Sequence, residues 1–367
     1  MQIPFVDLKS QYHAIKKEID SAIEGVLEST AFVLGKSVSE FEQSFAKAHN
    51  VAHCVGTSSG TDGNHLALWA LGLGPGDEVI VPNDTFIATA WGATLCGATP
   101  VFVDCEPDSY NIDPKKVEER ITPRTKAIVV VHLYGQSADL DPLLQIAKRR
   151  NIHLVEDCAQ GHFAEYKGKR VGGFGITSSF SFYPGKNLGA YGEAGAATTN
   201  DVELAKKFRL FRDHGSVEKY SHESYGHNYR MEGIQGAVLG VKLRYLDEWT
   251  RKRRAVAAKY NELLKGVGDI VLPKEMPYAK HVYHLYVIRT GNRDRMQKYL
   301  QERGVATGLH YPSPLHVQKC FSHLGYKADD FPVSVNLARQ CLSLPMYPEL
   351  TDAQIEYVCS NVRAFFD

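Results

Sequence analysis

Between residues 52 and 156, short apolar runs alternate with segments whose apolar residues recur at helical spacing. We expect strands at 52–56, 78–81, 100–104, 127–133 and 153–156, and helices between them at 64–73, 87–96, 116–121 and 140–149. This alternation is typical of an α/β fold in which a mainly parallel sheet carries helices on both faces. Because ligands of such sheets bind beyond the carboxyl ends of the strands, polar residues there are the first functional candidates.

The rest of the chain predicts flanking helices and a second, smaller lobe. Residues 4–30 suggest an amphipathic helix, a short helix runs through Phe41 and Phe45, and 232–254 suggest one long helix. Beyond it we expect strands near 281–288 and 306–310 and a closing helix at 352–365. A chain of 367 residues is long enough for two lobes. We predict a large α/β domain over 1–250 and a small C-terminal α+β domain over 251–367.

Charge and cysteine content exclude several classes of protein. The 42 Lys and Arg residues balance 42 Asp and Glu, so no basic field indicates a nucleic-acid or anionic-membrane partner. No apolar run approaches the roughly 18 residues of a membrane span. The N-terminus carries charges where a signal peptide needs an apolar core. Seven cysteines without a C-x-x-C pair argue against a zinc site and a disulfide framework. We expect a cytoplasmic protein without metal.

The stretch 178–197 places a lysine between two strands. Phe180 and Phe182 alternate with small polar residues, as on a half-buried strand, and Pro184-Gly185 then ends the run. Lys186 follows at once, before a glycine-rich return into a second apolar run at 194–199. The small residues around Lys186 let another group approach closely. The alternative is an ordinary turn lysine in water, which is the commoner case for a single lysine.

Other strand ends carry complementary groups. Ser59, Gly60 and Thr61 lie in a turn before a helix, where free N–H groups and the helix dipole suit a phosphate, although a simple helix cap fits as well. The pattern is neither G-x-G-x-x-G nor G-x-x-x-x-G-K-[ST]. Asp157 follows an apolar strand and needs a cationic or N–H partner, unless it caps the next helix. Phe86 begins a helix and could stack on a planar ring or fill the core.

These groups together suit pyridoxal 5'-phosphate. That cofactor needs a lysine for its imine and a carboxylate that keeps the pyridine nitrogen protonated. It also needs an anion seat for its phosphate and a flat apolar face for its ring. No single element is specific, but the combination is.

Nearly the whole chain resembles the DegT/DnrJ/EryC1/StrS family of sugar aminotransferases, which are fold-type-I pyridoxal-phosphate enzymes. The matching stretches are SSGTDGNHLAL, PNDTFIATA, VHLYGQ, VEDCAQ, SFYPGKNLGAYGEAGA, GHNYRMEGIQGA and HYPSPLH. The resemblance implies that Lys186 forms the imine, Asp157 meets the pyridine nitrogen, and Gln160 lies near the ring hydroxyl. It also implies that Phe86 stacks on the ring, and that Gly60, Thr61 and Ser181 hold the phosphate with Asn228 of the other subunit. The expected assembly is a homodimer with shared active sites.

The resemblance also suggests the reaction. Family dehydratases carry His in place of the lysine, so Lys186 favours transamination, with L-glutamate as the usual amino donor. The stretches HGSVEKYSHESYGHNYR and YPGKNLGAYGEAGA are most similar to enzymes that aminate C3 of a dTDP-linked 3-keto-6-deoxyhexose, giving a dTDP-3-amino-3,6-dideoxyhexose. The alternatives are amination at C4 of a UDP- or GDP-linked keto-sugar or of a cyclitol ketone, and a PLP-binding regulatory protein without turnover.

Several residues are candidates for the substrate side, although each histidine among them could equally be a surface or packed residue. The candidates are Tyr183, Lys219, Tyr220, His222, His310, Tyr311 and His316. The chain departs from the family pattern at Gly63, where alanine is common, and Asn64 and His65 are unusual neighbours. None of the three carries a role that the resemblance assigns.

Overall fold

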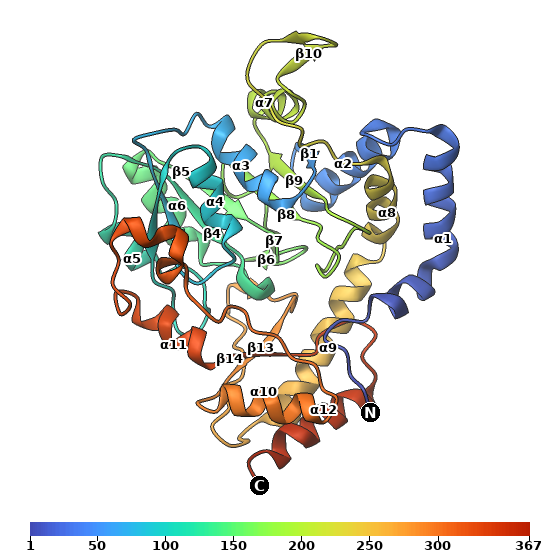
Figure 1. Ribbon diagram of the computed structural model, residues 1–367, viewed down its shortest axis with the longest axis vertical. Coiled ribbons are helices and arrows are strands. Elements are labelled where there is room, and N and C mark those ends of the chain that lie inside the picture. The colour runs from blue at the N-terminus through green and yellow to red at the C-terminus, as the bar shows by residue number, and fades with distance from the viewer.

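The computed structural model describes residues 1–367, and a seven-stranded sheet lies at its centre (Figure 1). The strands occur in the order β1-β9-β8-β5-β4-β2-β3. Their bounds are β1 (His53–Thr57), β2 (Glu78–Pro82), β3 (Thr99–Val103), β4 (Thr125–Val131), β5 (His153–Asp157), β8 (Thr177–Ser181) and β9 (Gly195–Thr199). Neighbours are parallel except at β9, which runs antiparallel to β1 and β8. The predicted mainly parallel sheet is confirmed.

Alternate side chains of each strand enter different cores, as the period of a strand requires. Ile80, Ile128 and Leu154 pack on one face with α2 (Gly35–His49) and α6 (Leu140–Arg150). Val79, Val129 and Val155 pack on the other face with α3 (Gly60–Ala70) and α4 (Ala88–Leu95). The helices α5 (Pro114–Glu119), α7 (Val202–Arg212) and α8 (Gly233–Leu243) complete the layers. Helices therefore cover both faces, as the β/α alternation predicts.

A second core lies below the sheet in Figure 1. It is built from α9 (Leu246–Leu264), β13 (Tyr286–Arg289), α10 (Arg293–Glu302), β14 (Cys341–Leu344) and α12 (Asp352–Ala364). The strands β13 and β14 pair antiparallel. The first residues of the chain, before α1 (Leu8–Ser29), join this core through Ile3, which pairs with Val305. The predicted domain boundary at residue 250 lies inside α9.

Two expected elements differ in the structure. The single helix over 232–254 is wrong, because α8 ends at Leu243 and α9 begins at Leu246 and continues to Leu264. The apolar spacing misled because Val241 and Trp249 pack in one cluster against α1 on either side of the break. The strand over 306–310 is also absent, since only Gly308 pairs, with Ser343. Ser343 belongs to β14, a strand that the sequence analysis does not predict.

The segment after residue 311 returns to the large lobe. It contains η2 (Leu315–Val317), η3 (Lys319–Leu324) and α11 (Pro332–Gln340). Leu315, Phe321 and Phe331 are buried in the core that also contains Phe102 of β3. A chain segment that belongs to the predicted small domain therefore helps to cover the sheet of the large one.

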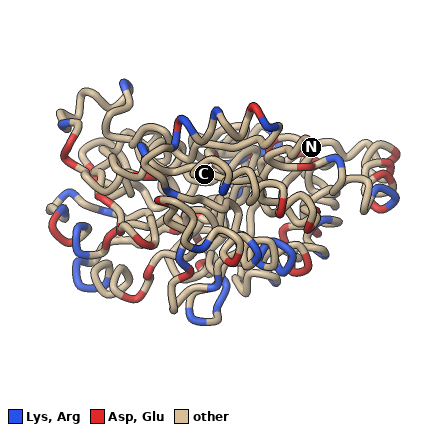
Figure 2. Tube along the Cα trace, turned by 90° about the horizontal axis from the view of Figure 1, so that it is seen from below, with Lys and Arg blue, Asp and Glu red and all other residues tan.

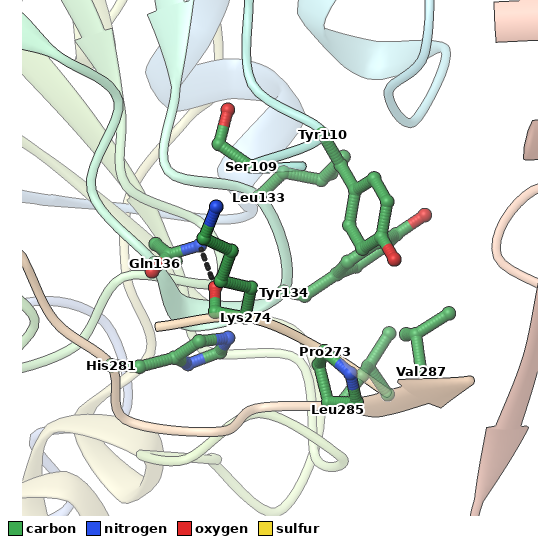
Figure 3. A pocket seen from close by; sticks show the side chains of 10 residues that line it. All are labelled: Ser109, Tyr110, Leu133, Tyr134, Gln136, Pro273, Lys274, His281, Leu285 and Val287. Atoms are coloured by element: carbon green, nitrogen blue, oxygen red, sulfur yellow. Dashed lines mark hydrogen bonds between the residues drawn. The ribbon is translucent and has the colours of Figure 1, made fainter. Parts of the chain in front are cut away.

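Gln136 ties the two lobes together after η1 (Leu133–Gly135). Its amide Nε2 donates to the carbonyl of Lys274 at 3.1 Å, and the N–H of Met276 donates to its Oε1 at 2.7 Å. Figure 3 shows this contact beside a cavity of about 10 Å³, lined on one side by residues such as Tyr110 and on the other by Pro273. That volume is close to the least that holds one water molecule. The seam between the lobes is therefore tightly closed at this point.

The surface carries both signs of charge. Figure 2 shows Lys and Arg interspersed with Asp and Glu along the whole trace, in keeping with the formal net charge of 0. None of the helices combines the length and the apolar character that crossing a membrane requires.

Short strands complete the fold. The strands β6 (Glu165–Tyr166), β7 (Lys169–Arg170) and β12 (Ala279–Lys280) form one sheet, and β10 (Ser216–Glu218) pairs with β11 (Ser221–His222) in a hairpin.

Candidate active site

Lys186 lies in a closed loop between β8 and β9. Its backbone N–H donates to the carbonyl of Tyr183 at 2.8 Å, which makes the turn after Pro184. The base of the loop is fixed because the N–H of Ala190 donates to the carbonyl of Phe182 at 2.7 Å. A Cβ at Gly189 would lie 2.2 Å from the carbonyl oxygen of Pro184, so only glycine fits there. The glycine-rich return therefore holds the lysine in one place.

The environment of Lys186 favours its neutral amine. Burial lowers the pKa of Lys186 to about 8, and the nearby charge of Asp157 opposes part of this shift. The side chain is partly buried in the structure. An amine with a pKa near 8 is free in a useful fraction at neutral pH, so it can act as a nucleophile or a base. This property separates Lys186 from an ordinary surface lysine.

Asp157 ends β5 and is buried among hydrogen-bond donors. The backbone N–H of Ala159 donates to its Oδ1 at 3.0 Å. The amide of Asn64 and the hydroxyl of Thr89 donate to its Oδ2 at 2.9 and 2.8 Å. A carboxylate has about four acceptor positions, so one remains on Oδ1 for a further donor such as a pyridinium N–H. The carboxylate fits the role that the sequence predicts for it.

The turn before α3 has the shape of an anion seat. A Cβ at Gly60 would lie 2.5 Å from the Cβ of Ser181, which shows how closely Ser181 approaches the start of the helix. The N–H groups of Gly60 and Thr61 open α3 and have no acceptor within the helix. The hydroxyl of Ser59 is the helix cap: it accepts from the N–H of Asp62 at 3.1 Å. Free N–H groups, the helix dipole and the hydroxyl of Ser181 suit a phosphate.

An exposed aromatic ring lies three residues before Thr89, whose hydroxyl donates to Asp157. The ring of Phe86 is 53% exposed, and its centroid lies 5.9 Å from that of Tyr311. Gln160 donates from Nε2 to the hydroxyl of Tyr311 at 2.9 Å, and the N–H of Tyr134 donates to its Oε1 at 2.6 Å. Gln160 is therefore held in place. An exposed phenylalanine ring at the mouth of a polar site offers a flat face to a planar group.

Histidines surround the lysine on the side of the small lobe. Burial lowers the pKa of His310 to about 4, and the charge of Lys186 adds to the shift. Burial and Lys186 also hold the pKa of His284 well below its usual value. His310 contacts the hydroxyl of Ser343 through Nδ1 at 2.8 Å, and His284 contacts Asn187, the residue after the lysine, at 3.2 Å. These imidazoles are neutral at pH 7 and serve as uncharged hydrogen-bonding groups.

Other predicted residues lie outside this group. Lys219, Tyr220 and His222 lie on the β10–β11 hairpin, which projects beyond α7 at the top of Figure 1. Tyr220 is 85% exposed, and Asn228 is exposed at the base of the hairpin, where it pairs with Asp213. Tyr183 lies exposed at the entrance of the lysine loop.

His316 is buried in a network of its own. Its Nδ1 contacts the side chain of Asn83, and its Nε2 contacts the carbonyl of Ala328 at 3.1 Å. Both ring nitrogens therefore have partners within the protein.

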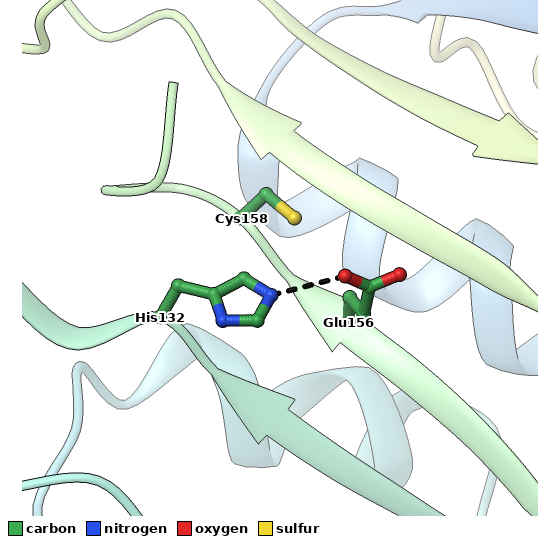
Figure 4. A group of neighbouring side chains, drawn as sticks. All are labelled: His132, Glu156 and Cys158. Carbon is green, nitrogen blue, oxygen red and sulfur yellow. Dashed lines mark hydrogen bonds and ion pairs between the residues drawn. The ribbon is translucent and has the colours of Figure 1, made fainter. Parts of the chain in front are cut away.

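A buried group of His132, Glu156 and Cys158 could be mistaken for a metal site (Figure 4). The Nδ1 of His132 accepts from the N–H of Ala138 at 3.2 Å, so its Nε2 carries the proton and donates to Glu156 at 3.1 Å. Glu156 also accepts three backbone N–H groups from residues 172–175. Hydrogen bonds thus account for the His and Glu ligand atoms, and the pair fixes the loop before β8.

Sequence reasoning missed several residues of the site. Asn64, Thr89 and Ser179 bind Asp157 or one another, and Tyr134 holds Gln160. Asn64 could have been found, because a buried amide in the apolar stretch around HLAL needs a polar partner. Thr89 and Tyr134 carry no such signal, since either residue is also common as an ordinary neighbour of a strand end.

The fold and the site together define a class: a lysine amine, a carboxylate and an anion seat at the strand ends of a mainly parallel sheet. Comparisons place the chain within it. The model of the DegT/DnrJ/EryC1/StrS aminotransferase family matches residues 13–363. A structure of DesV from S. venezuelae in complex with a ketimine intermediate superposes with a TM-score of 0.98 at 44% identity, covering 100% of this chain and 99% of that one. The chain belongs to this family.

Curated relatives match over almost their whole lengths. A dTDP-3-amino-3,6-dideoxy-alpha-D-galactopyranose transaminase from Aneurinibacillus thermoaerophilus is 45% identical, with 99% of each chain covered. A pleiotropic regulatory protein from Geobacillus stearothermophilus is 46% identical, covering 100% of this chain and 99% of the relative. A UDP-N-acetyl-3-dehydro-alpha-D-glucosamine 3-aminotransferase from Acidithiobacillus ferrooxidans is 42% identical over 98% of this chain and 97% of the relative.

Solved structures also identify the cofactor. The structure of NtdA from Bacillus subtilis, determined with bound PMP, the amino form of pyridoxal phosphate, is 32% identical with a TM-score of 0.91. It is covered over 85% of its length, and this chain over 100%. The protein is a pyridoxal-phosphate-dependent aminotransferase, as the four groups at the strand ends predicted.

Proposed function

We propose that the protein moves an amino group from L-glutamate to C3 of a dTDP-linked 3-keto-6-deoxyhexose, giving a dTDP-3-amino-3,6-dideoxyhexose. The observation that carries the proposal is the full-length similarity to the dTDP-3-amino-sugar transaminase of A. thermoaerophilus. Position 3 also recurs in the name of the UDP-sugar relative, so the position of amination has broader support than the nucleotide. A GDP-perosamine synthase from Caulobacter vibrioides, 40% identical over 89% of each chain, keeps a GDP-sugar as the alternative.

The residues divide the work of transamination. Bound pyridoxal phosphate supplies an electron sink for the negative charge that forms when the amino-bearing carbon loses its proton. Lys186 would hold the cofactor through Nζ. As a free amine, the same Nζ would take the proton from the amino-bearing carbon of the donor, and in the second half of the reaction it would return a proton to the carbon that is aminated. Asp157 would hold the proton on the ring nitrogen, and Phe86 would cover one face of the ring. Gly60, Thr61, Ser181 and the capped turn at Ser59 would bind the phosphate.

The amino donor and acceptor can be tested separately. Glutamate alone should convert the bound cofactor to its amino form, with an absorbance band moving from about 410–420 nm to about 330 nm. This conversion excludes the second candidate, a regulatory protein without turnover, which the G. stearothermophilus relative's name suggests. The aminated enzyme is then offered dTDP-, UDP- and GDP-linked keto-sugars, and NMR of the product locates the new amine. Amination at C4, or a preference for a UDP- or GDP-sugar, would overturn the proposal.

We also propose that two chains complete each site, with Asn228 contributed by the partner. Asn228 is exposed at the base of the β10–β11 hairpin, and the hairpin projects away from its own chain. Lys219, Tyr220 and His222 would then reach the same partner site, where a side-chain amide can donate to the phosphate. His310, Tyr311 and Tyr183 would contact the sugar nucleotide from the chain that carries Lys186.

Complementation tests the shared site. Lys186→Ala chains and Asn228→Asp chains are each expected to be inactive, the second because the new charge repels the phosphate. In a mixed dimer both changes fall in one site and leave the other intact, so activity returns after subunit exchange. Absence of recovery, with exchange proven by differently tagged chains, would place Asn228 in its own chain's site or in none.

A further inference from the structure

Asn64 lies at the centre of a buried chain of hydrogen bonds that ends on Asp157. The side chain projects from the second turn of α3, and its Nδ2 donates to Oδ2 of Asp157 at 2.9 Å. The hydroxyl of Ser179 on β8 donates to the Oδ1 of Asn64. Asn64, Asp157 and Ser179 are all buried, so water does not compete for these bonds.

The direction of this chain is fixed by chemistry. An ionised carboxylate only accepts hydrogen bonds, so the NH₂ end of the Asn64 amide must face Asp157. Its carbonyl end therefore faces Ser179, whose hydroxyl must donate. The helix α4 packs directly against this residue, since a Cβ at Gly92 would lie 3.1 Å from the backbone of Asn64. The amide is held between the sheet and α4 in a single orientation.

Thr89 supplies the second donor to the same oxygen. Its hydroxyl donates to Oδ2 of Asp157 at 2.8 Å, and the hydroxyl of Thr85 lies 3.1 Å behind it. Two neutral side chains from two helices thus occupy Oδ2, and the free acceptor position remains on Oδ1. Donors to a carboxylate stabilise its charged form and weaken its hold on any shared proton.

We propose that Asn64 is a positioning residue that keeps the proton shared with Asp157 on the pyridine nitrogen of bound pyridoxal phosphate. The inference rests on the proposed role of Asp157 at that nitrogen. With the amide in place, the carboxylate is turned to offer Oδ1 and binds the shared proton only weakly. Without it, Oδ2 loses one of its two donors, the carboxylate holds the proton more tightly, and the ring becomes a weaker electron sink.

The direct test is the ¹⁵N chemical shift of the ring nitrogen. Apoenzyme of the wild type and of Asn64→Leu is loaded with pyridoxal 5'-phosphate labelled at that nitrogen. The variant's shift should move toward the value of unprotonated pyridine, with kcat lower by about 10- to 100-fold and a smaller change in KM. Thr89→Val should move the shift in the same direction. Thr177→Val, which removes a buried hydroxyl that donates to the carbonyl of Thr198 and has no bond to Asp157, Asn64 or Thr89, is the matched control and should leave the shift unchanged. An unchanged shift in Asn64→Leu would overturn the proposal.

A second variant covers the case in which Asn64→Leu fails to fold, which circular dichroism of the apoenzyme reveals. Asn64→Asp keeps the shape and still accepts from Ser179. Its new carboxyl can donate to Asp157 only while protonated, and it repels Asp157 once ionised. Activity and the ¹⁵N shift of this variant should therefore approach wild type as the pH falls. A pH profile parallel to that of the wild type would contradict the role of the donor.

Asp157→Asn separates this inference from the proposed function. If Asp157→Asn leaves the ¹⁵N shift unchanged, Asp157 is not at the ring nitrogen and the proposed function of that residue fails. If Asp157→Asn moves the shift and Asn64→Leu does not, only the role of Asn64 fails.

Discussion

Two buried aspartates at the carboxyl ends of the sheet's strands, Asp157 and Asp84, differ in their hydrogen bonding. Asp157 is the last residue of β5, and Asp84 lies two residues after the end of β2. In the sheet, β4 lies between these two strands. Their exposed fractions are 3% and 2%. Asp157 accepts hydrogen bonds from Asn64, Thr89 and Ala159. Neither oxygen of Asp84 has a partner, and burial, with the nearby charge of Asp104, raises the pKa of Asp84 to about 8. The two carboxyls therefore differ in their hydrogen-bond donors and not in their depth.

The surroundings of Asp84 are aromatic. It lies near Tyr134 and Tyr311, whose hydroxyl pKa values are raised by burial and by the neighbouring carboxyl. Tyr134 donates its hydroxyl to the carbonyl of His310, and the Tyr311 hydroxyl accepts from Gln160. The Tyr134 hydroxyl is thus engaged as a donor, whereas the Tyr311 hydroxyl only accepts and keeps its own proton. Burial among these rings therefore favours the neutral form of Asp84.

The largest effect is expected from removing the amine of Lys186, whose pKa is influenced by Asp157. Lys186 is influenced by the charge of Asp157, whereas Asp84 does not contribute to its pKa. Lys186→Ala should bind pyridoxal phosphate but lose turnover by about 10⁴-fold or more, because one amine serves for both attachment and proton transfer. Steady-state assays with a glutamate donor measure the loss. Retention of a near wild-type rate would show that another group carries the proton.

Amide substitution should distinguish the two aspartates. Asp157→Asn removes the carboxylate that we propose to face the ring nitrogen, so kcat should fall on the order of 10²-fold or more. Asp84→Asn replaces a neutral carboxyl by a neutral amide of the same shape, and kcat at pH 7 should stay close to the wild-type value. Parallel kinetic measurements of the two variants suffice. Equal losses would mean that the contrast in hydrogen bonding has no functional consequence.

The last expected effect is on stability rather than on turnover. The pKa of Asp84 rises from 3.8 in the unfolded chain to about 8 in the folded one, so between these values the folded state keeps a proton that the unfolded state has lost. Stability therefore falls with rising pH through this window, by up to about 1.4 kcal/mol per pH unit. The Asp84→Asn variant has no carboxyl at this position, so its stability lacks this dependence on pH. Its Tm advantage over the wild type should grow from pH 5 to pH 8 and level off above that, as calorimetry can show; a constant difference would place the carboxyl in the charged state.

The sequence predicts the part of the molecule that depends on local pattern. The β/α alternation locates the strands of the sheet, and the strand ends locate Asp157, Gly60 and Lys186. The reason is physical: buried strands are short and apolar, and a lysine or carboxylate directly after one stands out. The cofactor follows from the kinds of group that meet at this edge.

The remaining features depend on contacts between distant segments. The break between α8 and α9 leaves the apolar spacing intact, so periodicity alone cannot reveal it. The return of η2 and η3 to the sheet depends on Phe321 meeting Phe102, which no local pattern records. Asn64 stands out in its helix, but its partner Asp157 is 93 residues away. The proposed contribution of a second chain depends on contacts that no pattern within one sequence records.

The pairing of Ile3 with Val305 joins two segments that the ribosome makes at very different times. The N–H of Ile3 donates to the carbonyl of Gly304 at 2.8 Å, and its carbonyl accepts from Ala306 at 3.0 Å, so this residue forms a rung of the small lobe. A ribosome adding about 5–20 residues per second makes residue 306 some 15–60 s after residue 3. The large sheet can assemble during that interval, while the chain's first residues wait for their partners. Ile3 is thus made long before the segment with which it pairs.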